Sequence, residues 1–76
     1  MPKLPVVRAS ELLRALKRLG FYKFHQSGSH IQLRRADGRK TTIPYHPSKE
    51  IKKGTLRAII NDLDLSVDEL IKVLKK

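Results

Sequence analysis

A histidine at the start of a short alternating run is the first residue whose neighbours suit it to proton transfer. The run Ile31–Arg34 follows His30 and alternates apolar with polar side chains. A strand with a period of two therefore turns the apolar pair to one face, and His30 with the polar pair to the other. Gly28 lies two residues earlier and lets the backbone bend. Because histidine titrates near neutral pH, an exposed His30 beside a cation is suited to moving protons on an anionic substrate. On position alone, the simpler interpretation of an ordinary surface histidine is favoured.

Positive charge dominates the composition. The 76 residues include 17 Lys and Arg against 7 Asp and Glu, which gives a formal net charge of +10. Between His30 and Arg57 there are eight cations and two acids, whereas Ala58–Lys76 carries three cations and four acids. Such a surface attracts polyanions, with nucleic acid ahead of an acidic protein and of an anionic membrane. The middle of the chain is therefore expected to carry the anion-binding face.

Length and composition restrict what the chain can be. Residues 1–76 are long enough for one small domain with a single thin core. The absence of cysteine excludes disulfides and thiolate chemistry. The first residues lack the apolar region of a signal peptide, and no apolar run approaches the roughly 18 residues of a membrane span. We therefore expect a cytoplasmic protein that does not contact a membrane and is a monomer when free.

Three amphipathic helices are expected from apolar spacing and end signals. The first begins after Ser10 as N-cap, carries leucines at helical spacing and ends at Gly20. The second begins at Gly54-Thr55, and the third begins at Ser66–Glu69, which has the capping-box pattern. Each helix has one apolar stripe, so together they can cover one face of a small sheet.

The segment between the first two helices predicts three strands. The strands expected from alternation and β-propensity are Phe21–Gln26, His30–Arg34 and Lys40–Ile43. Asp37-Gly38 between the last two is a strong hairpin signal. Tyr22 and Phe24 share a face, and we favour core packing of this pair over stacking on RNA bases because the core needs their bulk. The sequence thus predicts an α+β fold of order α-β-β-β-α-α, with a three-stranded antiparallel sheet, helices on one face and the other face wet.

Two further histidines are weaker candidates for a catalytic role. His46 lies in a tight loop and is either a second proton-transfer candidate or a structural loop residue. His25 is expected to be a surface or strand-pairing residue. The spacings of five and sixteen between the three histidines match no common zinc pattern. We therefore expect neither a metal nor a cofactor.

Cations cluster beside the second helix and beside the hairpin. A helix N-terminus offers free N–H groups and partial positive charge, so Lys52, Lys53 and Thr55 are suited to hold a phosphate. A helix cap with two solvated lysines is the alternative, and both descriptions can hold together. Arg39 and Lys40 beside the hairpin are further candidates for RNA contact, although exposed hairpin cations are usually just solvated.

Four short motifs occur in the same order in a known family. They are Gly20-Phe21, Gly28-Ser29-His30, Pro44-x-His46 and Lys52-Lys53-Gly54-Thr55-Leu56. From about Ser10 to Leu70 the chain resembles the HicA family of toxins, small ribonucleases of type II toxin–antitoxin systems. The resemblance implies one HicA-like domain with a double-stranded-RNA-binding-like fold, cleavage of mRNA, and inhibition by a HicB-type antitoxin. It also places the family's catalytic histidine on His30, with Gly28 and Ser29 in the same motif.

RNA cleavage requires only modest chemistry from the protein. A base takes the proton of the ribose 2′-OH, the hydroxyl attacks the adjacent phosphorus, and an acid protonates the departing 5′-oxygen. An imidazole fits this role, and cations stabilise the charge that develops on the phosphorane. We expect His30 to act as general base or acid, with Ser29, Gly28 and His46 as supporting candidates. Lys23 and Arg34 on the neighbouring strands are the expected charge stabilisers.

Three functions therefore remain open at the level of the sequence. The leading one is a metal-independent endoribonuclease toxin acting on mRNA through His30, without cofactor. The second is a non-catalytic RNA-binding module that uses the same basic surface. The third is an inactive family member that only binds its antitoxin. In each case a surface of charge +10 favours an acidic protein partner, and we expect the antitoxin to cover His30.

Overall fold

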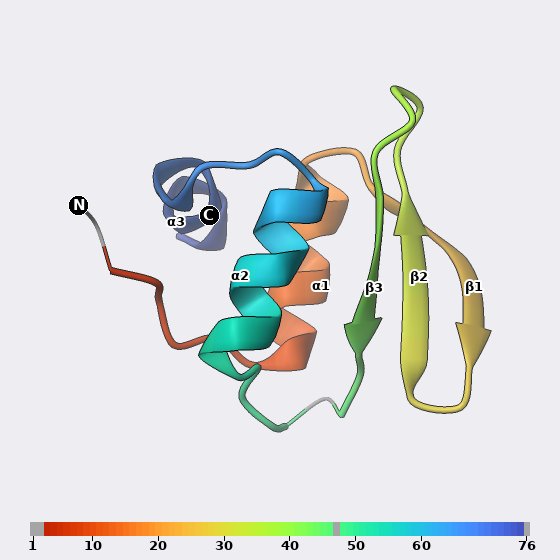
Figure 1. The fold of residues 1–76 in the computed structure, drawn as a ribbon, viewed down its shortest axis with the longest axis horizontal. Coiled ribbons are helices and arrows are strands. Elements are labelled where there is room, and N and C mark those ends of the chain that lie inside the picture. The colour runs from red at the N-terminus through yellow and green to blue at the C-terminus, as the bar shows by residue number, and fades with distance from the viewer. Residues whose placement is uncertain (1–2, 47, 76) are drawn as a thin grey trace.

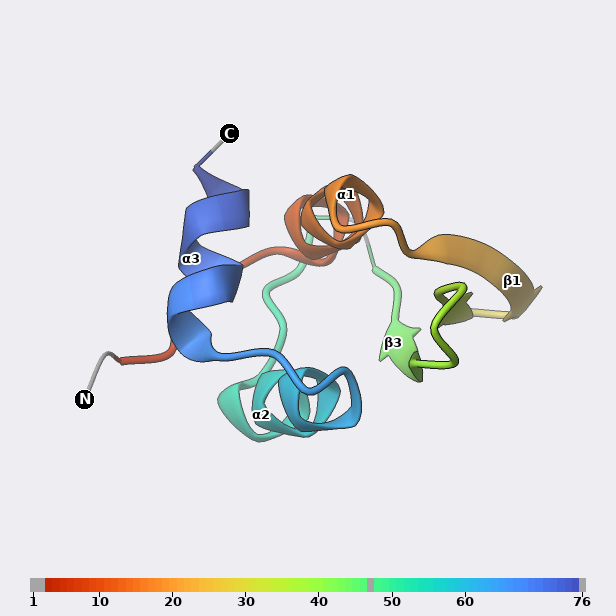
Figure 2. The same cartoon turned by 90° about the horizontal axis from the view of Figure 1, so that it is seen from above.

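Two layers make up the protein, a three-stranded sheet and a layer of helices. The structure is a computed structural model that describes residues 3–46 and 48–75. The elements in order are α1 (Ala9–Arg18), β1 (Tyr22–Ser27), β2 (His30–Arg34), β3 (Lys40–Pro44), α2 (Lys53–Asp62) and α3 (Val67–Leu74). The strands pair antiparallel in the order β1-β2-β3. Helices α1 and α2 both lie on one face of the sheet, and α3 lies beyond them (Figures 1 and 2).

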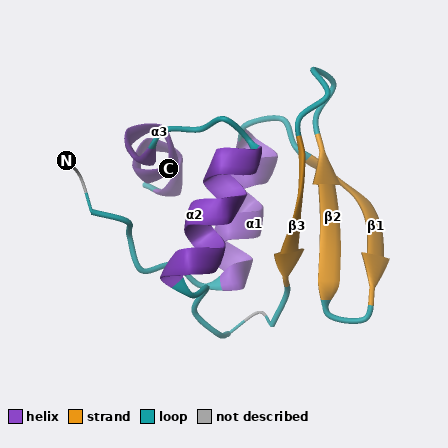
Figure 3. Ribbon diagram, viewed as in Figure 1, coloured by secondary structure: helices purple, strands orange, loops and turns teal. Residues whose placement is uncertain are grey.

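This architecture confirms the predicted α+β fold and is consistent with a double-stranded-RNA-binding-like fold. The helices and the strands separate into two layers in Figure 3, with one face of the sheet left uncovered. Within the described residues, no helix is long and apolar enough to cross a membrane.

The core lies between the sheet and the helices. Alternation along β2 buries Ile31 and Leu33 and exposes His30 and Gln32, as predicted, while Arg34 is half-buried. Apolar stripes of the helices meet these strand residues. Fully buried side chains in this core include Leu12 and Leu16 of α1, Leu33 of β2, Ile43 of β3, Leu56 of α2, and Leu70 of α3.

The start of α1 differs from the prediction. Ser10 lies inside the first turn, and Arg8 is the N-cap. The backbone N–H of Ile51 donates to the carbonyl of Val7, and Ala9 N–H donates to the carbonyl of Lys49. These bonds hold the chain extended up to Arg8, so the helix begins directly after it. Tertiary pairing to the loop before α2 therefore overrides the capping preference of Ser10.

The end of α1 agrees with the prediction at Gly20. Gly20 has φ 95°, its N–H donates to the Lys17 carbonyl, and the N–H of Phe21 donates to the Leu16 carbonyl. This is the Schellman arrangement, which satisfies two carbonyls at the helix end and requires a left-handed residue. The chain then turns directly into β1, with Phe21 buried in the core.

The aromatic residues of β1 differ from the prediction that they pack in the core. Tyr22 and Phe24 are each 51% exposed, and all six residues of β1 are exposed. A β-bulge between Lys23 and His25 inserts Phe24 as an extra residue in the strand. Lys23 pairs with a core residue of β2, so Tyr22 and Phe24 on either side of it turn away from the helices. The prediction that they pack in the core was therefore wrong, and Phe21 is the buried aromatic.

Candidate nucleic-acid interface

The turn between β1 and β2 positions His30. Gly28 has φ 57° and is the first of its two central residues, as a type II′ hairpin turn requires. The carbonyl of Ser29 accepts a hydrogen bond from the backbone N–H of Tyr45, which follows β3. The turn is therefore tied to both neighbouring strands. Gly28 and Ser29 have a structural role here, since they fix the backbone immediately before His30.

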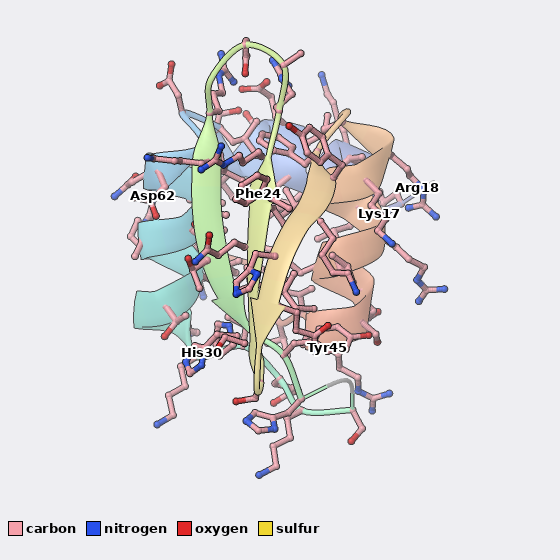
Figure 4. All side chains as sticks on the ribbon, turned by 90° about the vertical axis from the view of Figure 1, so that its right-hand side faces the viewer. Lys17, Arg18, Phe24, His30, Tyr45 and Asp62 are labelled. Atoms are coloured by element: carbon pink, nitrogen blue, oxygen red, sulfur yellow. The ribbon has the colours of Figure 1, made fainter. Side chains whose placement is uncertain are left out.

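His30 is exposed at one end of the sheet. It is the first residue of β2, and its cross-strand partner in β3 is Pro44. In Figure 4 its side chain lies low on the sheet, on the side where α2 begins. The imidazole is therefore open to a ligand from solvent and is not packed among the leucines. The prediction that His30 lies on the wet face is confirmed.

Polar and basic residues share the uncovered face with His30. Residues paired directly across antiparallel strands lie on the same face. His25, Gln32 and Thr42 form one such row, and Arg34 with Lys40 forms the next. We call this surface the outer face; its residues are Tyr22, Phe24, His25, His30, Gln32, Arg34, Lys40 and Thr42.

A shallow groove runs along the β2–β3 side of the outer face. Its volume is about 440 Å³, and Gln32, Arg34, Lys40 and Thr42 are among the residues that line it. The carboxylate of Asp62 lies at its edge, where it accepts a hydrogen bond of 2.9 Å from the hydroxyl of buried Thr41. The groove thus offers two cations and two neutral hydrogen-bonding side chains to a ligand.

A second pocket lies where α2 begins. Its volume is about 350 Å³, and the residues that line it are Pro44, His46, Lys49, Glu50, Ile51, Lys52 and Thr55. Pro44 is the strand partner of His30, so this pocket adjoins the end of the sheet that carries His30. The structure therefore brings three sequence candidates, His46, Lys52 and Thr55, to one site. Lys53 does not line the pocket; it is the exposed first residue of α2.

The two expected charge stabilisers lie on opposite faces of the sheet. Lys23 pairs with Leu33, which faces the helices, and its ammonium group donates to the Gln26 side chain at 3.3 Å. Arg34 is on the outer face but four residues along β2 from His30, which is about 13 Å at 3.3 Å per residue. Neither side chain is adjacent to His30. The lysines beside α2 are the better placed positive charges.

Arg39 connects the hairpin between β2 and β3 to the end of α2. Its guanidinium donates to the Leu63 carbonyl at the end of α2 at 3.0 Å, and its Nε lies 3.1 Å from the Asp37 carboxylate. Arg35 donates to the same carboxylate at 2.7 Å and to the carbonyl of Leu19. Lys40, in contrast, is exposed and belongs to the outer face. Of the two hairpin candidates, Lys40 is the one whose charge is directed to solvent.

The pKa of Asp37 is below its ordinary value. Partial burial of the carboxylate raises this pKa, but hydrogen bonds from the Arg35 side chain and the Arg39 backbone N–H lower it, together with the charges of both arginines. The lowering causes prevail. Asp37 therefore stays ionised at neutral pH and neutralises part of the positive charge of the hairpin.

Several residues of the outer face and of the pocket beside α2 were not predicted as site residues. Gln32 follows from the alternation of β2, which also places Arg34. Phe24 was missed because a bulge is invisible in a strand-like run. Lys49 carried no sequence signal beyond its charge, and only its proximity to Lys52 in the pocket makes it a candidate. Within residues 3–46 and 48–75, no group of three His, Cys, Asp or Glu residues is arranged to hold a metal ion.

Comparison with known proteins identifies the family. A family model described as the HicA toxin of bacterial toxin–antitoxin systems matches residues 9–65, about three quarters of the chain. The matched range includes α1, the whole sheet with His30, α2, and the residues that line the groove and the pocket beside α2. No curated protein matches the chain. Because the match extends over well more than half of its length, the chain belongs to the HicA family of bacterial toxins.

Proposed function

We propose that this toxin is a metal-independent endoribonuclease that cleaves mRNA with His30 as general acid or base. The observation that supports the proposal most is the exposed imidazole of His30, held by a tight turn at the edge of a basic surface. RNA supplies its own nucleophile, the 2′-hydroxyl. The protein therefore needs a group that transfers a proton and positive charge that holds the phosphate.

The reaction balances without a co-reactant. A base removes the proton of the 2′-hydroxyl, and the 2′-oxygen forms a bond to the adjacent phosphorus. The bond from phosphorus to the 5′-oxygen breaks, and an acid supplies a proton to that oxygen. One product then ends in a 2′,3′-cyclic phosphate and the other begins with a 5′-hydroxyl. His30 performs one of the two proton transfers, and His46 is the candidate for the other.

The pocket beside α2 is suited to hold the phosphate next to the cleaved bond. Lys49, Lys52 and Thr55 line it with one acidic residue, Glu50, so that the two lysines leave its lining positive. The N-terminus of α2 adds partial positive charge. His46 lines the same pocket, which supports its candidacy as a proton-transfer residue. Lys40 and Arg34 on the outer face extend the positive surface away from this point.

A toxin of this family has an antitoxin partner, and we propose that the partner is a HicB-type protein with an acidic contact surface. The net charge of +10 favours such a partner and speeds its capture at low salt. Inhibition is most direct if the antitoxin covers His30 and the pocket beside α2. A complex that leaves His30 open to RNA would contradict this arrangement.

The experiment that tests the function compares wild type with His30→Ala on RNA in the presence of EDTA. We expect wild type to cut the RNA and leave cyclic phosphate ends. His30→Ala should lose cleavage while it keeps its RNA affinity and its fold, because the side chain is exposed. If wild type binds RNA but cuts none with EDTA or with Mg²⁺, a non-catalytic RNA-binding module is the better description.

A further inference from the structure

An exposed phenylalanine on the outer face lies outside the hydrophobic core. Phe24 is 51% exposed, and it is the extra residue of the β-bulge in β1. In Figure 4 it lies over the sheet on the side turned away from α1 and α2, with His30 lower on the same sheet. Bulges occur often beside functional sites, where they redirect a side chain. Here the bulge places an aromatic ring on the face that carries the candidate catalytic residue.

Arg34 holds this ring in place from the neighbouring strand. The guanidinium carbon of Arg34 lies 3.6 Å from the centroid of the Phe24 ring, a cation–π contact. The contact occupies one side of the ring, and the exposed half of the side chain remains accessible. A ring that already contacts Arg34 before a ligand arrives loses less entropy on binding than a free one.

Cations surround Tyr22, the other exposed aromatic residue of the outer face. Tyr22, equally exposed, lines a hollow of about 290 Å³ with Arg34, Arg35 and Lys40. The other large exposed apolar residue among the described ones, Val6, lies against α3 in a different hollow. A protein partner would need a contiguous apolar patch around the ring. Aromatic rings set among cations are instead what single-stranded nucleic acid binds, through base stacking and phosphate contacts.

We propose that Phe24 and Arg34 form a subsite that stacks one unpaired nucleobase of the RNA. The proposal rests on the proposed function only in that the ligand is RNA. A base can stack on Phe24 only if it is not paired within a duplex. The substrate is therefore single-stranded at this point, and the groove lined by Gln32 and Thr42 is placed to accept the edges of the same base or its neighbour. Lys40 in that groove provides a contact for the backbone.

The test measures RNA affinity in His30→Ala protein, so that no RNA is cut. The probes are a short fluorescein-labelled single-stranded RNA and the same RNA annealed to its complement. Phe24→Leu, which keeps apolar bulk but removes the aromatic face, should weaken single-strand binding about 5- to 100-fold, while Phe24→Trp should preserve it. Duplex binding should respond to neither change. Val6→Ala is the matched control, because Val6 is exposed but distant from the sheet.

A second measurement separates stacking from any indirect effect. A set of RNAs is made in which each RNA lacks the base at one position. At one of these positions, loss of the base should weaken binding to the protein that has Phe24 and leave binding to Phe24→Leu unchanged. Equal single-strand affinity of Phe24→Leu and the parent would overturn the subsite, and so would a loss confined to binding of the antitoxin. If the parent binds RNA and wild type cuts it, such a result leaves the proposed function standing. Failure of the parent to bind any RNA would instead refute both.

Discussion

Lys52 and Lys53 are adjacent residues of equal charge, but their surroundings predict different effects on RNA binding. Lys52 lines the pocket with His46 and Thr55, whereas Lys53 does not. If the pocket holds an RNA phosphate, Lys52→Ala removes one phosphate contact. Lys53→Ala then removes only a surface charge. The pair therefore distinguishes a built phosphate site from general attraction by the net charge.

The magnitude follows from counterion release. For a single strand, each neutralised phosphate contributes about 0.7 to the slope of log affinity against log salt concentration. Loss of one contact should therefore lower the slope by about 0.7, which is about a fivefold loss of affinity at 0.1 M salt relative to 1 M. For Lys53→Ala we expect a slope close to that of the protein without this change, because a lysine outside the pocket contacts no phosphate and releases no counterion there.

The assay is fluorescence anisotropy of a labelled single-stranded RNA, measured over about a tenfold range of NaCl concentration so that the slope can be determined. Both variants are made in the His30→Ala background, so that the RNA stays intact. Circular dichroism confirms that each variant is folded. An unchanged slope for Lys52→Ala, or equal reductions in both variants, would show that the pocket does not hold a phosphate.

The remaining predictions concern stability. Gly20→Ala forces a left-handed conformation on alanine and should lower the free energy of unfolding by about 1–2 kcal/mol. The added Cβ would lie at an ordinary contact distance of 3.6 Å from Arg35, so the backbone conformation alone causes this loss. Gly54→Ala, in open space within α2, should raise it by about 0.4–1 kcal/mol; urea unfolding that shows similar effects for both would refute the backbone argument. Because its pKa is lower in the folded than in the unfolded protein, the ionised Asp37 carboxylate stabilises the fold. This stabilisation is complete at a pH above the unfolded pKa of about 3.9, and it is lost as the pH falls through the folded pKa. Asp37→Asn should therefore lower the urea midpoint at pH 7 and flatten its decline in acid, and an unchanged acid profile would contradict this.

Local patterns predicted the parts of the fold that depend on neighbouring residues. Alternation in Ile31–Arg34 was sufficient to place His30 on the uncovered face, because a strand of period two with one buried face has a single workable orientation. The capping box of α3 is present as expected, with the Ser66 hydroxyl accepting from the Glu69 N–H and the Glu69 carboxylate accepting from the Ser66 N–H. Gly20 ends α1 for the same local reason.

Features that depend on distant contacts were not predictable in this way. The start of α1 depends on hydrogen bonds to the loop before α2, about 40 residues later. The extra residue in β1 reversed the expected faces of Phe24 and Lys23, and nothing in the aromatic run indicates a bulge. Arg39 was expected to contact RNA because of its charge, and its hydrogen bond to the Leu63 carbonyl could not be predicted from the residues around it. Charge alone does not distinguish a ligand contact from a helix-end contact.

The most direct test of the central claim is the single-turnover rate of RNA cleavage by His30→Ala relative to His25→Ala, with EDTA present. Both histidines are exposed on the outer face, but only His30 adjoins the pocket beside α2 through its partner Pro44. If His30 transfers a proton to or from the RNA, its loss should slow cleavage by about 10²–10⁴-fold, while His25→Ala stays within a few-fold of wild type. Equal rates for the two variants would contradict the role of His30.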